Sequence, residues 1–173
     1  MIIVKRHNRS IMITIGILLV SVLVVITVLL TVQILKPKPP IAKSITAQAN
    51  FIILVPISPA IVIDSKSAGY NSSLKLIDYN VTMQGVKTVV SEQPAPSVFT
   101  DVPATYEKTL ASMNQYSQFD SLEGAVYLTK PQQLAGKQAA VLLSKGTLMF
   151  VKPSSDLTDD QWRQFFNSLV VNQ

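Results

Sequence analysis

The sequence predicts an α+β fold: an antiparallel β-sheet with helices packed on one face, carried behind one N-terminal transmembrane helix. The first observation behind it is an apolar segment at residues 11–35 that contains no charged residue. The second is a series of short, branched apolar runs from residue 51 onward, separated by turn residues and closed by an apolar stripe at helical spacing. The chain is therefore expected to divide into a cytoplasmic tail (1–10), a transmembrane helix (11–35), a Pro/Lys-containing linker (36–50) and an extracytoplasmic α+β domain (51–173).

The apolar segment is long enough to cross a membrane. A helix needs roughly 20 apolar residues to span the hydrocarbon core of a bilayer, and residues 11–35 exceed that length. A helix also satisfies its own backbone hydrogen bonds, so lipid tolerates it. A helix of this length in a soluble core would have a polar face, and this segment has none. We therefore expect the lipid bilayer as a partner through residues 11–35.

The net charge of +5 is concentrated beside this segment. From residue 41 onward, ten Lys or Arg residues balance ten Asp or Glu residues, so the domain itself is neutral. A nucleic-acid-binding surface needs cations clustered on the folded domain, and no nucleic-acid partner is expected. The short basic tail before the first apolar segment indicates a cytoplasmic N-terminus and an extracytoplasmic C-terminal domain. The flanking cations are Lys5, Arg6, Arg9, Lys36 and Lys38.

A cleaved signal peptide is the alternative to an uncleaved signal anchor. The apolar region of a signal peptide usually has about 7–15 residues, fewer than are found here. The Ala-x-Ala site of the chain, Ala47-Gln48-Ala49, lies well beyond the end of the apolar segment. We therefore expect the segment to remain as an anchor in the cell membrane.

The linker and the strands are predicted from prolines, glycines and branched residues. Lys36 to Pro40 is expected to be a stiff spacer, because consecutive prolines favour polyproline II. Gln84-Gly85 and Lys145-Gly146 are expected to be tight hairpin links, with glycine supplying a positive φ. Residues 65–73 are interpreted as a polar loop. Strands are predicted at 51–57 (with 61–63 as a continuation), 73–81, 86–92, 125–129, 138–144 and 147–152.

Two helices are predicted. The first covers residues 101–116, with Asp101 as its cap and Pro103 in its first turn. The second begins at Thr158, which forms a capping-box pattern with Gln161. The apolar stripe of this second helix is expected to pack on the sheet, and a partner-binding face is the alternative. The stripe consists of Trp162, Phe165, Phe166, Leu169 and Val170.

Several motifs of the outer domain occur in a recognisable order. They are Phe51-x-x-x-Val55-Pro56-x-x-Pro59, a strand near 74–79, Val89 to Pro94, Gly146 to Phe150, and a helix that ends in Asn167-Ser168-Leu169. This order resembles the uncharacterised extracytoplasmic domains of some bacterial membrane-tethered anti-sigma factors and small single-pass envelope proteins. The resemblance covers residues 51–169 and implies a half-open antiparallel sheet, with no catalytic residues. The ten-residue tail leaves no room for a sigma-binding domain, so direct anti-sigma activity is not expected.

The residues that could support catalysis or metal binding are few. The only histidine, His7, lies in the expected cytoplasmic tail, and the chain has no cysteine. Histidine-based triads and metal sites, thiolate sites, disulfides and a lipid-modified cysteine are therefore not expected in the outer domain. Ser65-Lys66 and Ser144-Lys145 are candidate Ser-Lys pairs. Adjacent residues of a strand point to opposite faces, so both pairs are interpreted as loop and turn residues.

The acidic residues are interpreted as solvated or capping groups. A glycosidase-like pair needs two facing carboxylates, and a calcium site needs more oxygen ligands in a looped spacing. Candidates for the pair are Asp64, Asp78, Glu92, Asp101, Asp120 and Glu123, and the cluster near the last helix consists of Asp156, Asp159 and Asp160.

Together these features predict a non-enzymatic, membrane-anchored binding or sensing module with no cofactor, metal or catalytic site. The expected partner is another envelope protein, a lipid or a cell-wall ligand, with the concave face of the sheet as the place for an apolar ligand. One alternative is a structural or accessory subunit of an envelope complex. The other is a histidine-free envelope hydrolase that uses a Ser-Lys pair or two carboxylates.

Overall fold

The structure is a computed structural model that describes residues 39–172. The predicted cytoplasmic tail and transmembrane helix, residues 1–35, lie outside the described residues. The described residues belong to one compact unit, Pro39–Gln173. None of the helices between residues 39 and 172 has the length and apolar character needed to cross a membrane.

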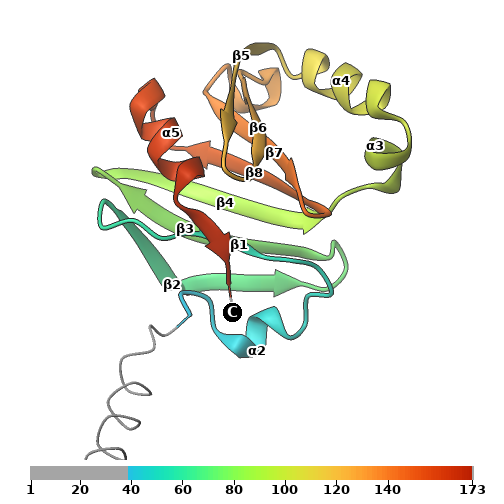
Figure 1. Cartoon of the computed structure of the whole chain (residues 1–173). Helices are drawn as coiled ribbons and strands as arrows, with labels where there is room; N and C mark the ends of the chain where they lie inside the picture. Colours follow the sequence, from blue (N-terminus) through green and yellow to red (C-terminus); the bar gives the residue numbers. More distant parts are fainter. Residues whose placement is uncertain (1–38, 173) are drawn as a thin grey trace, which may run out of the picture. The chain divides into compact units, whose positions relative to one another are not determined.

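An antiparallel seven-stranded sheet forms the centre of this unit (Figure 1). Its strand order is β2-β3-β4-β8-β7-β6-β5, so two meanders meet where β4 pairs with β8. The mixed helix-and-sheet class predicted from the sequence is confirmed at this level. The strands are β2 Ile61–Asn71, β3 Leu76–Met83, β4 Val86–Pro94, β5 Gln115–Ser121, β6 Gly124–Thr129, β7 Ala139–Ser144 and β8 Thr147–Pro153, with a 3-10 turn η1 at Gln132–Leu134.

The two predicted hairpin links are confirmed. Gln84 and Gly85 have φ angles of 48° and 84°, and Lys145 and Gly146 have φ angles of 50° and 77°. Two successive residues with positive φ match the turn that suits the twist of a two-residue hairpin. These turns hold β3 against β4 and β7 against β8.

A two-stranded ribbon and a helix cover one face of the sheet. The ribbon pairs β1 (Leu54–Pro56) with β9 (Leu169–Val171), and helix α5 (Asp159–Asn167) leads into β9. The predicted capping box of α5 is confirmed: Thr158 Oγ1 accepts from the Gln161 N–H, and Gln161 Oε1 accepts from the Thr158 N–H. Most of the predicted stripe is buried in the core. Val170, by contrast, lies in β9 and is 39% exposed.

Helices pack on both faces of the sheet, so the prediction of helices on one face is wrong. Val126 and Leu142 belong to the core that includes the aromatic residues of α5. The adjacent Tyr127 and Val141 point the other way and pack with Leu110 of helix α4 (Pro103–Ser112). The reason is that β7 is apolar on both sides, which requires cover on both sides.

The helix predicted at 101–116 is shorter in the structure, because only α4 lies within that range and β5 begins at Gln115. Asp101 ends α3 (Ser97–Asp101), and the N-cap of α4 is Val102, which provides no side-chain cap. The chain then enters β5, a strand that the sequence analysis missed. Only Phe119 of β5 is buried, so the sequence of this edge strand lacks a clear apolar alternation.

Part of the segment expected as linker is folded against the core. It contains the one-turn helix α2 (Lys43–Thr46), and Ile41 is fully buried. The Ile41 N–H donates to Asn172 Oδ1, and Asn172 Nδ2 donates to the Ile41 carbonyl, both over 3.2 Å. The beginning and the end of the described chain are therefore joined directly.

Candidate functional site

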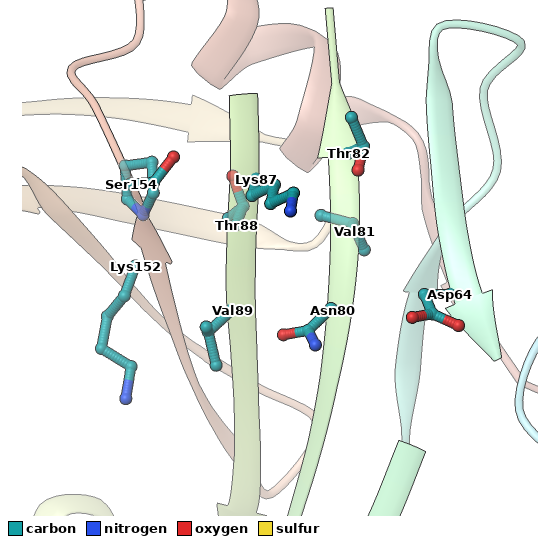
Figure 2. A pocket seen from close by; sticks show the side chains of 10 residues that line it. Asp64, Asn80, Val81, Thr82, Lys87, Thr88, Val89, Lys152 and Ser154 are labelled. Atoms are coloured by element: carbon teal, nitrogen blue, oxygen red, sulfur yellow. The ribbon is translucent and has the colours of Figure 1, made fainter. Parts of the chain in front are cut away.

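A groove with a volume of about 460 Å³ crosses β2, β3, β4 and β8 (Figure 2). Asn80 on β3 lines it, whereas the neighbouring Tyr79 points into the core under α5. On β8, Phe150 packs in the cluster under α4, and Lys152, two residues on, lines the groove. The groove therefore lies on the α4 side of the sheet, next to the part that α4 covers. We call it the sheet groove, and its main side chains are Asp64, Asn80, Thr82, Lys87, Val89 and Lys152.

Strand register arranges four of these residues in one row, as Figure 2 shows. Asp64 is opposite Asn80, Asn80 is opposite Val89, and Val89 is opposite Lys152. Neighbouring strands lie about 4.8 Å apart, so three spacings give a row about 14 Å long. The row is acidic at one end, basic at the other and apolar between Asn80 and Lys152.

A wide irregularity in β2 positions the acidic end. Between the pairs Asp64–Asn80 and Gly69–Asp78, four residues of β2 face one residue of β3. Ser67 bridges the gap, because its Oγ donates to the Asp64 carbonyl (2.6 Å) and accepts from the Asn80 N–H (2.8 Å). Residues 65–71 of the predicted polar loop thus belong to strand β2, where the Ser67 side chain replaces part of the backbone ladder, and only residues 72 and 73 lie in a turn.

The two lysines of the sheet groove have no acidic partner. Among residues 39–172, the only ion pair joins Lys145 to Glu123. The Asp64 carboxylate accepts from the Lys66 N–H at 3.1 Å, and among residues 39–172 neither Lys87 nor Lys152 forms an ion pair with a carboxylate. Unpaired, partly solvated cations are available to an anionic ligand.

A buried acid lies on the opposite face of the sheet. The prediction that Glu92 on β4 is a solvated acid is wrong, because its side chain is fully buried beneath β1. Its Oε2 accepts from the Leu54 N–H at 2.8 Å, and its Oε1 has no hydrogen-bond partner. Burial raises the pKa of the Glu92 carboxyl to about 8, although the hydrogen bond from the Leu54 N–H favours the charged form.

The predicted Ser-Lys pairs do not form a dyad. Ser144 Oγ donates to Glu123 Oε2 at 3.2 Å, and Lys145 Nζ lies 2.8 Å from the same oxygen. A dyad requires the lysine nitrogen to accept the serine proton, whereas here a carboxylate accepts from both groups. The other pair, Ser65-Lys66, lies exposed in the irregular part of β2.

The remaining acidic candidates have separate surroundings. Asp78 accepts a hydrogen bond from Ser91 Oγ, and Asp101 accepts one from Thr100 Oγ1. Asp159 and Asp160 occupy the first turn of α5. Within residues 39–172, no three or more His, Asp or Glu side chains gather in a way that could hold a metal ion.

The face expected to receive an apolar ligand is occupied by the protein itself. Trp162, Phe165 and Phe166 of α5 are fully buried against the sheet, together with Leu54 of β1. The stripe packs on the sheet as expected, apart from the partly exposed Val170, and core side chains fill the place predicted for an apolar ligand. The sheet groove is not predictable from the sequence, because alternation along Asp78 to Met83 indicates a polar face but not whether another element covers it.

No protein-family model, no curated protein and no solved structure matches this chain. The resemblance to extracytoplasmic domains of anti-sigma-like and single-pass envelope proteins stays a prediction.

Proposed function

We propose that the chain is a membrane-anchored, extracytoplasmic binding module that holds an anionic cell-wall fragment in the sheet groove. One observation carries the proposal: two lysines without acidic partners face a groove of about 460 Å³ on the uncovered part of the sheet. That volume lies within the roughly 300–1,000 Å³ that small-ligand sites occupy. The charge-free segment 11–35 and its basic flanks support the anchor.

The lining of the groove favours a ligand with both carboxylates and hydrogen-bonding groups. Lys87 and Lys152 provide positive charge, and Thr82 and Asn80 provide a hydroxyl and an amide. The partly exposed Val89 offers a small apolar surface between Asn80 and Lys152. A wall fragment with free carboxylates matches these groups better than a lipid chain, which would leave the polar groups without partners.

Charge reversal in the groove tests the proposal. The full-length protein in detergent is titrated with purified, size-fractionated wall fragments, and binding is measured by calorimetry at low and moderate salt. We expect the double substitution Lys87→Glu and Lys152→Glu to weaken binding at least about tenfold, because two ligand-facing cations become anions. Binding by the unsubstituted protein should also weaken as salt increases.

The matched control reverses two exposed lysines outside the groove, Lys108→Glu and Lys137→Glu. This variant changes the net charge equally and should bind as the unsubstituted protein does. Equal weakening by both double variants, or no binding by the unsubstituted protein, would contradict a site in the sheet groove. Co-purification of a stoichiometric envelope protein with no bound wall fragment would favour an accessory subunit instead.

A further inference from the structure

The hydrogen bonds from strand β1 to the main sheet involve the two backbone groups of one residue, and the side chains of Leu54 and Val55 pack in the shared core. The Leu54 N–H donates to Glu92 Oε2 at 2.8 Å, and the Leu54 carbonyl accepts from the Tyr79 hydroxyl at 2.7 Å. In the backbone ladder, β1 pairs only with β9. A glutamate and a tyrosine side chain therefore replace the strand neighbour that β1 lacks on the sheet.

The surroundings of Glu92 leave its charged form without a cation. Its neighbours in register are Ile77 on β3 and Met149 on β8, and Leu54 of β1 covers it. Tyr79 is the titratable group that faces it, and burial raises the pKa of this tyrosine well above its ordinary value. No Lys, Arg or His of the described chain lies within ion-pair distance of the Glu92 carboxylate.

The neutral carboxyl fits this position better than the carboxylate. A protonated carboxyl can still accept the Leu54 N–H through Oε2 while Oε1, which has no partner, carries the proton. A carboxylate in the same place is a buried charge with one hydrogen bond from the backbone and no counter-ion, which is costly. Loss of the proton therefore favours any state in which Glu92 reaches water.

We propose that Glu92 is a proton-dependent latch: its protonated carboxyl holds β1 on the sheet, and its deprotonation releases β1 from the sheet. The predicted linker, residues 36–50, precedes β1 in the chain. Release of β1 therefore changes how the N-terminal end of the domain is attached to the sheet. The latch lies on the face of the sheet opposite the sheet groove, and the inference does not depend on the proposed ligand.

The direction of the pH effect follows from the two states of Glu92. In the docked state its pKa is about 8, and in the released, solvated state it returns toward the ordinary value of 4.5. Between these values release sheds a proton, so the opening constant of β1 rises about tenfold per pH unit. The latch is therefore most stable below pH 4.5 and is lost as the pH rises through 8.

Amide hydrogen exchange tests the latch in the full-length protein in lipid nanodiscs, read at Leu54 by NMR between pH 5 and 8. Protection is the exchange rate of an unstructured amide at the same pH divided by the measured rate. We expect protection at Leu54 to fall about tenfold per pH unit, because the opening constant rises by that factor. Near pH 8 it should also lie at least about tenfold below protection at Leu142 in β7, which opens only with the whole domain.

The variant Glu92→Gln keeps an acceptor for Leu54 and cannot ionise. Its Leu54 protection should be independent of pH, whereas Glu123→Gln, which changes another mostly buried acid, should behave as the unsubstituted protein does. Protection that is independent of pH in the unsubstituted protein would overturn the latch. Equal protection at Leu54 and Leu142 at every pH would overturn it too, because β1 would then open only on global unfolding. The pH series of the unsubstituted protein decides the question even if a variant fails to fold.

Discussion

Asn172 and Ile41 hold each other by two hydrogen bonds although 131 residues separate them in the chain. The amide of Asn172 satisfies both backbone groups of Ile41, and its own backbone N–H donates to the Ile53 carbonyl at 2.9 Å. One side chain thus attaches the entry of the domain to the strand that ends it. The first prediction tests how much stability this contact contributes.

Replacing Asn172 with alanine should lower the free energy of unfolding by about 1–2 kcal/mol, because two hydrogen bonds to a buried residue are lost. Urea denaturation of the full-length protein in detergent, followed by circular dichroism, measures the change. Asn167→Ala is the matched control, since Asn167 is exposed on α5. An equal effect of both substitutions would show that the contact adds no stability.

The overall stability of the domain should depend on the protonation of Glu92. The folded-state pKa of about 8 is higher than the ordinary value of 4.5, so this group stabilises the fold most at low pH. Its contribution should fall by up to about 1.4 kcal/mol per pH unit as the pH rises between these values. Urea midpoints at pH 5, 6, 7 and 8 measure the slope. Glu92→Gln should have a smaller slope than the unsubstituted protein, and equal slopes would contradict the assignment.

The aromatic core under α5 should dominate the stability of the fold. Trp162 is fully buried, lies 6.2 Å from Phe166 between ring centroids, and donates from Nε1 to Gln138 Oε1 at 3.1 Å. Trp162→Ala should lower the free energy of unfolding by about 3–5 kcal/mol, because it leaves a large cavity. Leu122→Ala, at a side chain that is 82% exposed, should change it by less than about 0.5 kcal/mol. Thermal unfolding followed by circular dichroism separates the two outcomes.

The absence of cysteine makes the predicted membrane topology easy to test. Ser72→Cys places one thiol in the exposed turn between β2 and β3, and Ser10→Cys places one before the apolar segment. We expect a membrane-impermeant maleimide to label the first variant in intact cells and the second only after permeabilisation. Labelling of Ser10→Cys in intact cells, without labelling of Ser72→Cys, would reverse the predicted orientation.

Local signals in the sequence were sufficient for several elements. The glycine in a two-residue link predicted the hairpin around Gly146. Glycine adopts a positive φ easily, as it does here, whereas few other residues do. The capping box predicted the start of α5, since Thr158 and Gln161 satisfy backbone groups that the helix itself leaves free. Both signals act within a few residues, so they do not depend on the rest of the fold.

Edge strands and helix boundaries depended on distant partners. Strand β5 is mostly polar, and pairing with β6 supplies its backbone hydrogen bonds. Strand β9 continues the apolar stripe of α5, so the sequence predicts that the helix extends into it. In the structure this segment is extended, because it pairs with β1. A three-residue strand such as β9 has too little local preference to be recognised without its partner.

The sequence by itself determined the alternation that separates the two faces of each strand, the tight turns and the amphipathic closing helix. Only the tertiary structure decided which of those faces are covered. Glu92 shows the difference, because it shares a face of β4 with Val90 and becomes a buried acid only when β1 crosses that face. Lys152 shows the converse, since it follows the covered residue Phe150 yet faces the open groove. Alternation is set by backbone geometry within one strand, whereas burial depends on which distant segment packs above it.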